Sequence, residues 1–220
     1  MRYHILNQRK DRADLKDELV FETLAGHGLT GRFINYDGYS KNVQLYNDAE
    51  ISSFDHEATN GVIHTLNNVV GHIQSGTLLD IAKEREELSE ILKAIDAAGL
   101  TDLLTGAIPA STPLTFAAPT NDAIKKLPGG TWDALLNNRT QLTDVLQYHF
   151  ASAGTWMTRG LVDKLKVETL NKKANWTVSF DSQNAIKIDD ASIVFGDLSA
   201  TNGVVHIIDG VLLPHPKTNR

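Results

Sequence analysis

The feature of this sequence that most constrains its fold is a segment of twelve residues that occurs twice. It reads TNGVIHTLNNVV from Thr59 and TNGVVHIIDGVL from Thr201, 142 positions further along the chain. Asn-Gly between two runs of strand-forming residues is a strong signal for a tight turn, because both residues tolerate positive φ. The repeat therefore predicts the same turn and the same closing strand in two places.

The match between the two parts of the chain continues upstream of this segment. The matching pairs are Ile51 with Ile193, Asp55 with Asp197, 43–45 with 186–188, 22–24 with 168–170, and Tyr3-His4 with Tyr148-His149. A period this long indicates a duplicated domain, since solenoid units run to about 20–50 residues. The second copy also has residues 74–147 ahead of Tyr148, for which the first copy has no counterpart. We therefore expect the first domain to lack its front half.

The front half of the second copy has a helical pattern, and its rear half has a strand pattern. Between residues 77 and 98, apolar residues recur every three or four positions, at Leu88, Ile91, Leu92 and Ile95, and Gly99 follows as a stop signal. Shorter helices are expected at 121–126, 131–136 with Thr131 as N-cap, and 140–147. After Tyr148 the apolar residues alternate, at Val178, Phe180, Ile186, Ile188, Ile193 and Phe195. This order predicts an α+β domain.

Three segments of the second copy resemble the landmark motifs of the fasciclin-like domain. They are LTFAAPTNDAIKKLP (114–128), YHFASAG (148–154) and TNGVVHIIDGVLLP (201–214), and the first copy resembles the latter part of that domain through YHILNQ and TNGVIHTLNNVV. The resemblance implies a tandem α+β protein, in which each copy is a β-wedge or sandwich with helices packed on it. The expected domains are a partial one over 1–73 and a complete one over 74–216, with a tail at 217–220.

The resemblance also implies a function. Fasciclin-like domains are expected to act as non-catalytic adhesion or interaction modules, with a protein or glycan partner on a cell surface or in a matrix. The location implied is extracellular, periplasmic or cell-surface, although the sequence shows no signal or anchor segment. The alternative is a small-ligand or polysaccharide-binding protein of a bacterial envelope. A hydrolase or a nucleotide-binding enzyme ranks third.

Charge and hydropathy argue against two other classes of partner. The net charge is −6, and the basic residues are scattered apart from a short cluster at Arg9, Lys10 and Arg12. A nucleic-acid binder needs a concentrated basic face, so nucleic acid is not expected as a partner. No apolar run approaches the roughly 18 residues that a transmembrane helix requires.

One segment spells a dinucleotide fingerprint, G-x-G-x-x-G, from Gly26 to Gly31. That fingerprint needs a helix after it, so that a pyrophosphate can sit at the helix N-terminus. Here the following residues, 32–36, have the pattern of a strand. We therefore interpret the glycines as part of a hairpin and expect no cofactor.

Four of the eight histidines form two matched pairs, His4 with His149 and His64 with His206. A metal site is not expected, because no third ligand stands at a recognisable spacing. In the last strand His206 shares a face with Val204 and Ile208, which favours a buried, hydrogen-bonded histidine. Nor does any nucleophile-elbow motif support a catalytic triad, so no catalytic residue is assigned.

The remaining candidates are residues of the motifs themselves. Asp197-Leu198 and Tyr148-His149 match positions that are implicated in integrin recognition in animal matrix members of the resembled family, so they are the candidate partner contacts. The competing interpretation of Asp197 is a hydrogen bond to local backbone at the turn. The other motif residues are expected to be structural, with Asn121-Asp122 capping a helix: Thr120, Asn121, Asp122, Asn202, Gly203, His206, Tyr3, His4, Asn60, Gly61 and His64.

Overall fold

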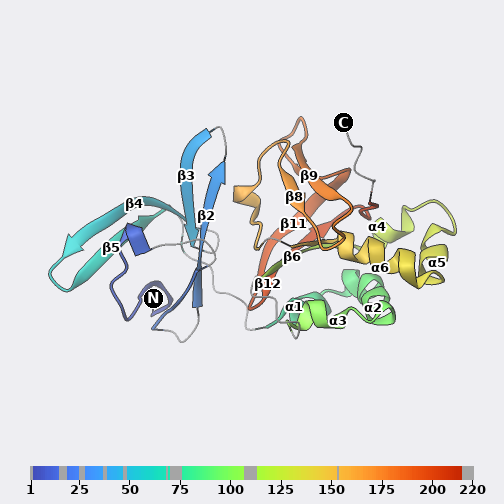
Figure 1. The fold of residues 1–220 in the computed structure, drawn as a ribbon, viewed down its shortest axis with the longest axis horizontal. Coiled ribbons are helices and arrows are strands. Elements are labelled where there is room, and N and C mark those ends of the chain that lie inside the picture. The colour runs from blue at the N-terminus through green and yellow to red at the C-terminus, as the bar shows by residue number, and fades with distance from the viewer. Residues whose placement is uncertain are drawn as a thin grey trace. The chain divides into compact units, whose positions relative to one another are not determined.

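The computed structural model of the 220-residue chain describes residues 2–14, 19–24, 28–36, 39–46, 49–67, 69, 76–106, 113–152 and 154–214. The chain divides into two compact units, Met1–Ile73 and Gln74–Arg220. The ribbon in Figure 1 shows strands in the first unit, and both strands and a group of helices in the second.

The described residues of the second unit form six α-helices. They are α1 (Leu78–Lys83), α2 (Ser89–Ala98), α3 (Thr101–Thr105), α4 (Asn121–Lys125), α5 (Thr131–Leu136) and α6 (Arg139–Tyr148), with 3-10 turns at Glu86–Leu88 and Thr158–Gly160. Gly99 ends α2 in the left-handed conformation, with φ 72°, as predicted. The N-cap of α5 is Gly130, so the assignment of Thr131 to that position was wrong by one residue.

The helical pattern over 77–98 was expected to give one helix, and the structure divides it. A capping box between Thr77 and Asp80 starts α1, which ends at Lys83. The amide side chain of Asn121 then binds the start of α2, where Oδ1 accepts from Glu90 N at 2.9 Å and Nδ2 donates to the Glu86 carbonyl at 3.1 Å. A side chain distant in sequence therefore fixes this break, which helical periodicity alone does not reveal.

The strands of the second unit form one sheet in the order β7-β6-β12-β11-β10-β9-β8. Their bounds are β6 (Leu114–Pro119), β7 (Phe150–Ala151), β8 (Lys166–Glu168), β9 (Asn175–Phe180), β10 (Ile186–Ile188), β11 (Ala191–Ala200) and β12 (Gly203–Ile208). All neighbours are antiparallel except β12 and β6, which are parallel. Every residue of β6 is buried, so this strand shows no alternation of apolar and polar residues.

The two ends of this sheet meet, so that it is nearly closed. Ala151, at the end of β7, forms a bridge with Thr169, next to β8, and Leu170 N donates to the Phe150 carbonyl at 2.9 Å. Apolar residues fill the inside of the sheet, and a second core lies between the sheet and the helices. Val205 and Ile207 of β12 belong to the helix-side core, whereas Ile208 belongs to the inner core. This confirms the α+β fold and the two faces expected for β12.

The described residues of the first unit form a five-stranded antiparallel meander. Its strands are β1 (Leu19–Glu22), β2 (Gly28–Tyr36), β3 (Tyr39–Tyr46), β4 (Ala49–Ala58) and β5 (Gly61–Leu66), and 3-10 turns lie at Arg2–His4 and Arg12–Asp14. Leu24 N donates to the Ile5 carbonyl at 2.8 Å, and Leu6 forms a bridge with Thr23. β1 pairs with β2 from Glu22 opposite Gly28. The glycine fingerprint therefore runs into a strand, although Gly26 and His27 lie outside the described residues.

The β4/β5 hairpin of the first unit and the β11/β12 hairpin of the second have the same register. Ile51 pairs with Leu66 as Ile193 pairs with Ile208, and Ala58 pairs with Gly61 as Ala200 pairs with Gly203. The register shifts also fall at matching places, two in each hairpin. The repeated sequence therefore encodes a bulged hairpin of one geometry in both units.

Candidate functional site

Asp197 lies in the bulge of β11 with φ 62°, a left-handed conformation that Asp tolerates better than most residues. Its Oδ1 accepts a hydrogen bond from Thr158 N at 2.8 Å, and its Oδ2 accepts one from Thr158 Oγ1. Its backbone N–H donates to His206 Nδ1 at 3.0 Å. The carboxylate thus binds the 3-10 turn at Thr158–Gly160 and does not cap the turn at Asn202-Gly203.

His206 is fully buried beside this bulge. Because a backbone N–H can only donate, His206 Nδ1 is the acceptor, and the ring proton is on Nε2. Nε2 then donates to the Trp156 carbonyl, 2.6 Å away. Asp197 and His206 together fasten the bulged strand to residues 156–158, and we call this arrangement the aspartate–histidine clamp.

The first unit contains the same clamp. Asp55, at φ 56°, donates its backbone N–H to His64 Nδ1 at 3.2 Å, and His64 Nε2 contacts the Lys10 carbonyl at 2.8 Å. Asp55 Oδ1 accepts from Arg12 N at 2.9 Å, as Asp197 Oδ1 does from Thr158 N. The Arg12 guanidinium also lies over the Phe54 ring, 4.7 Å from its centroid.

Tyr148 and His149 are buried at the end of α6. The Tyr148 hydroxyl lies 2.7 Å from Asp189 Oδ2 and 3.0 Å from the Asn175 carbonyl. Burial, together with the carboxylate of Asp189, raises the pKa of Tyr148 above its ordinary value. His149 Nε2 accepts from Leu212 N at 3.0 Å, so Nδ1 carries the proton and donates to the Val145 carbonyl at 2.8 Å. Burial lowers the pKa of His149 to about 4.

The four candidate contact residues therefore differ in what a partner could reach. Tyr148, His149 and Leu198 are 2%, 0% and 7% exposed, whereas the Asp197 side chain is 24% exposed. His4, the first-unit counterpart of His149, is exposed, and the Tyr3 side chain lies outside the described residues.

The other motif residues hold helices. Thr120 caps α4 by accepting from Ala123 N at 3.0 Å, whereas Asp122 forms an exposed ion pair with Lys125 at 2.8 Å. The prediction that Asp122 caps this helix was therefore wrong. Asn202 joins two helices, because Oδ1 accepts from Leu78 N at 2.8 Å and Nδ2 donates to the Leu104 carbonyl at 3.0 Å.

Two exposed apolar residues near Asp197 were missed in the sequence. Val194 and Phe195 are 56% and 51% exposed, and the Arg85 guanidinium lies over the Phe195 ring, 5.1 Å from its centroid. Strand alternation predicts that Phe195 points inward, but the register shifts on either side of it change which side chains of β11 point inward. The sequence does contain a signal for this exposed stretch. Residues 193–195 are three apolar residues in a row, whereas the first unit has Ser52 and Ser53 at the positions that match 194 and 195.

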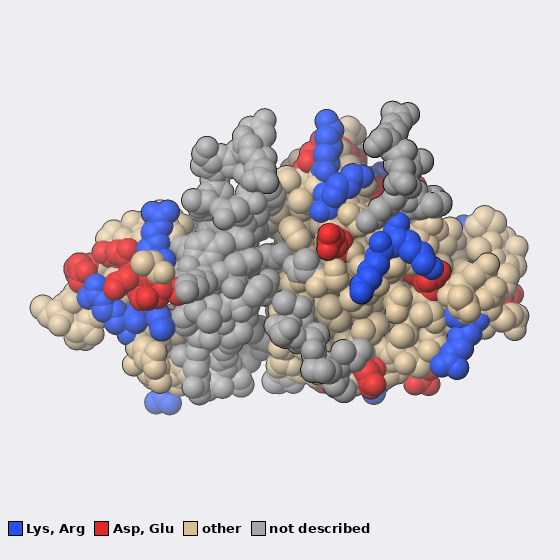
Figure 2. Space-filling view, in the orientation of Figure 1, with Lys and Arg blue, Asp and Glu red and all other residues tan. Residues whose placement is uncertain are grey.

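Charges on the first unit are mixed. Arg9 forms ion pairs with Asp11 at 2.9 Å and Glu57 at 2.7 Å, and its hydrogen bonds hold the pKa of Glu57 below the ordinary value. Acidic and basic side chains lie side by side there in Figure 2. Within the described ranges, no cluster of three His, Asp or Glu residues is arranged to hold a metal ion, and no helix there is long and apolar enough to cross a membrane.

The family model of the fasciclin domain matches residues 1–72 and 86–214 of this chain. The chain belongs to the fasciclin-domain family. It is 30% identical over 220 residues to transforming growth factor-beta-induced protein ig-h3 of Sus scrofa, covering 97% of this chain and 30% of that protein. It is 34% identical over 143 residues to protein sll1483 of Synechocystis, covering 63% of this chain and 73% of that protein.

A solved structure shows the same fold. It is the FAS1 domain pair of the insect cell adhesion molecule fasciclin I, with a TM-score of 0.51 and 18% identity, covering 96% of this chain and 78% of that chain. By length, this fasciclin-domain chain spans only about 30% of the relative ig-h3.

Proposed function

We propose that this chain is a non-catalytic adhesion or interaction module that works outside the cytoplasm, at a cell surface, in a matrix or in a cell envelope. The observation that carries the proposal is that the polar motif residues form hydrogen bonds within their own domain. His149, His206 and Asp197 all bind backbone groups of their own domain, which leaves these groups committed to the fold. Similarity to a domain pair from a cell adhesion molecule supports the same function.

We place the contact surface on β11 of the second unit. Val194 and Phe195 present exposed apolar side chains there, whereas the carboxylate of Asp197, two positions further on, is bound to Thr158. Exposed aromatic residues beside a polar rim are typical of protein interfaces. Leu198, Tyr148 and His149 would then act indirectly, by holding the strand that carries this surface.

Attachment of cells to the immobilised chain tests this proposal. We expect the double variant Val194→Ser with Phe195→Ser, which copies Ser52 and Ser53 of the first unit, to reduce attachment at least tenfold with an unchanged melting temperature. Leu136→Ser, at another exposed apolar residue, is the matched control and should attach as the parent does. Equal attachment by the parent and the double variant would reject this surface.

The alternative function, a small-ligand or polysaccharide binder of a bacterial envelope, is favoured by one observation in the first unit. A cavity of about 440 Å³ lies between residues 4–10 and the β4/β5 hairpin. Ligand sites commonly have about this volume. A glycan array with the intact chain separates the two functions, because an adhesion module that recognises protein gives no saturable glycan signal.

A further inference from the structure

Phe195 lies on the face of the second-unit sheet that the helices cover, yet they leave half of its side chain exposed. In the register it is opposite Ile207 of β12, and directly opposed residues of antiparallel strands point to the same face of a sheet. Ile207 is buried in the helix-side core, whereas Phe195 is half-exposed. The helices therefore bury one member of this pair and leave the other in contact with solvent.

The Arg85 guanidinium contacts this exposed ring. Arg85 lies between α1 and the 3-10 turn that follows it, and its Cζ lies over the Phe195 ring, 5.1 Å from the centroid. Its backbone is held on both sides, because its N–H donates to the Ala82 carbonyl at 3.2 Å and its carbonyl accepts from Leu88 N at 3.0 Å. The fold thus places a cation beside an exposed aromatic surface before any partner binds.

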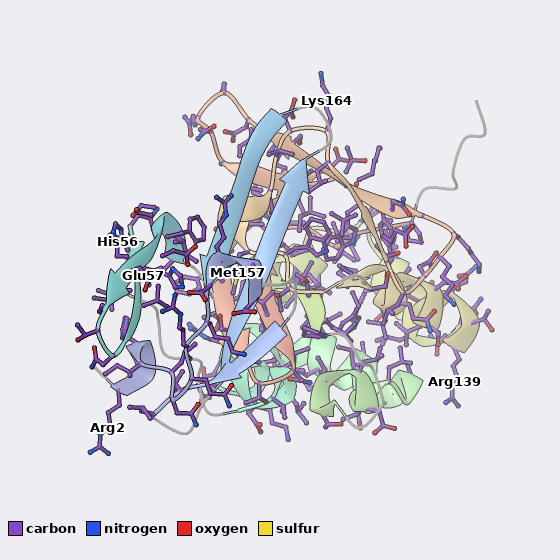
Figure 3. All side chains as sticks on the ribbon, turned by 60° about the vertical axis from the view of Figure 1, so that its left-hand side comes forward. Arg2, His56, Glu57, Arg139, Met157 and Lys164 are labelled. Carbon is purple, nitrogen blue, oxygen red and sulfur yellow. The ribbon has the colours of Figure 1, made fainter. Side chains whose placement is uncertain are left out.

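Two other arginines use their guanidinium groups inside the chain. Arg9 forms an ion pair with Glu57 at 2.7 Å, and Arg139 donates to the Ala98 carbonyl at 3.3 Å. Figure 3 shows Glu57 on β4 and Arg139 on α6. Among the described residues, the Arg85 guanidinium has its contact with the Phe195 ring and no carboxylate partner. A guanidinium carries its N–H donors in a fixed fork that fits a carboxylate, so this group is available to an acidic partner.

We propose that Phe195 and Arg85, which we call the aromatic–arginine site, bind an apolar segment of a partner protein that carries one carboxylate. The apolar part of the segment covers the Phe195 ring and the adjoining Val194, and an Asp or Glu side chain accepts hydrogen bonds from Arg85. Covering the site removes water from the ion pair, which strengthens it. This inference rests on the contact surface proposed above and adds the chemistry of the partner.

The charges around Arg85 favour a single carboxylate over a polyanion. Glu84, Glu86 and Glu87 adjoin Arg85 in the chain, and all three are exposed. A sulfated or uronic polysaccharide carries repeated negative charges and would bring several of them within the roughly 10 Å over which these glutamates repel them. One Asp or Glu beside apolar residues brings only the charge that Arg85 neutralises. A protein segment is therefore the partner that fits.

Selection of peptides on the intact chain tests this inference. The probe is a phage-displayed library of random linear peptides, selected on the immobilised parent and depleted on the double variant Val194→Ser with Phe195→Ser. We expect the recovered peptides to be enriched, relative to the unselected library, in Asp or Glu close to an aliphatic or aromatic residue. Recovery of peptides without this enrichment, or recovery of none, overturns the proposal.

The affinity of one recovered peptide, labelled with fluorescein and measured by anisotropy, isolates the role of Arg85. We expect Arg85→Gln to weaken binding by about tenfold or more, because a charge-assisted pair is lost. Arg85→Lys should weaken it less, because an ammonium keeps the charge without the fork. Lys83→Gln is the matched control, since it removes the same charge from an exposed side chain two positions away. Equal affinity of the parent and Arg85→Gln, or equal losses in Arg85→Gln and Lys83→Gln, overturns the proposal.

Two further measurements separate this inference from the adhesion function on which it rests. Binding of the parent to heparin beads that is lost in Arg85→Gln would make the site a polyanion site and contradict a protein segment. Cell attachment that depends on Val194 and Phe195 but is unchanged in Arg85→Gln would overturn the inference and leave the adhesion function standing. Acidic peptides that bind through Arg85 to a chain that attaches no cells would support the site and reject adhesion.

Discussion

The backbone N–H of Asp197 donates to His206 Nδ1 at 3.0 Å, and Asp55 donates in the same way to His64 at 3.2 Å. Each aspartate has a left-handed backbone conformation, and the second ring nitrogen of each histidine contacts a backbone carbonyl of an earlier segment. The clamp thus connects three separate stretches of chain in each unit. Its recurrence explains why the aspartate and the histidine keep their spacing in both copies.

The stability of the second unit should fall with acid because of His149. Its pKa is about 4 in the folded state and 6.5 as the ordinary value, so the unfolded chain binds a proton first as pH falls. Stability from this residue is complete above about pH 6.5 and is lost progressively down to about pH 4, by on the order of 3 kcal/mol. Urea unfolding at a series of pH values measures how steeply the unfolding free energy changes with pH.

His149→Gln is the control for this pH dependence. Its side-chain oxygen can accept from Leu212 N, yet it does not titrate. We expect the variant to lose most of the slope between pH 6.5 and 4 while remaining folded at pH 7. An unchanged slope would assign the acid sensitivity to other groups.

Asn202 and Asn60 occupy the same turn position but should differ in effect. Asn202 binds Leu78 N and the Leu104 carbonyl, so Asn202→Ala leaves two partly buried backbone groups without their partner. The expected loss in unfolding free energy is about 2–3 kcal/mol. Asn60 is exposed, and Asn60→Ala should change stability by less than about 0.5 kcal/mol. Equal effects of the two substitutions would refute this role for Asn202.

Much of the second unit could be predicted from the sequence, because its signals are local. The Asn-Gly turn, the stop at Gly99 and the helices near 121–126, 131–136 and 140–147 depend on neighbouring residues. The strand at 114–119 could not be predicted in this way, since it is buried on both faces and lacks alternation. The break after α1 and the exposure of Phe195 also depend on distant contacts, from Asn121 and from the bulge. The candidate site showed the same limit: the sequence identified Asp197 and His206 but not the residues they bind.

The two units should differ in their ability to fold alone. Both apolar cores described above lie in the second unit, whereas the described buried residues of the first are Thr23, Ala49 and Ile51. We expect residues 74–216 to melt cooperatively when expressed separately, and residues 1–73 to show no cooperative transition. Differential scanning calorimetry of the two fragments checks this. A sharp transition from the 1–73 fragment would show that its sheet is sufficient.

The central claim of this account is that Asp197 builds the domain and does not recognise a partner through its carboxylate. The measurement that tests it is the unfolding free energy of Asp197→Ala in urea, with cell attachment recorded on the same preparation. Loss of two hydrogen bonds to Thr158, with alanine forced to φ 62°, should destabilise the second unit by about 2 kcal/mol, and the still folded variant should attach as the parent does. Stability within about 0.5 kcal/mol of the parent, together with the loss of a divalent-cation-dependent attachment, would contradict the claim and make Asp197 a contact residue.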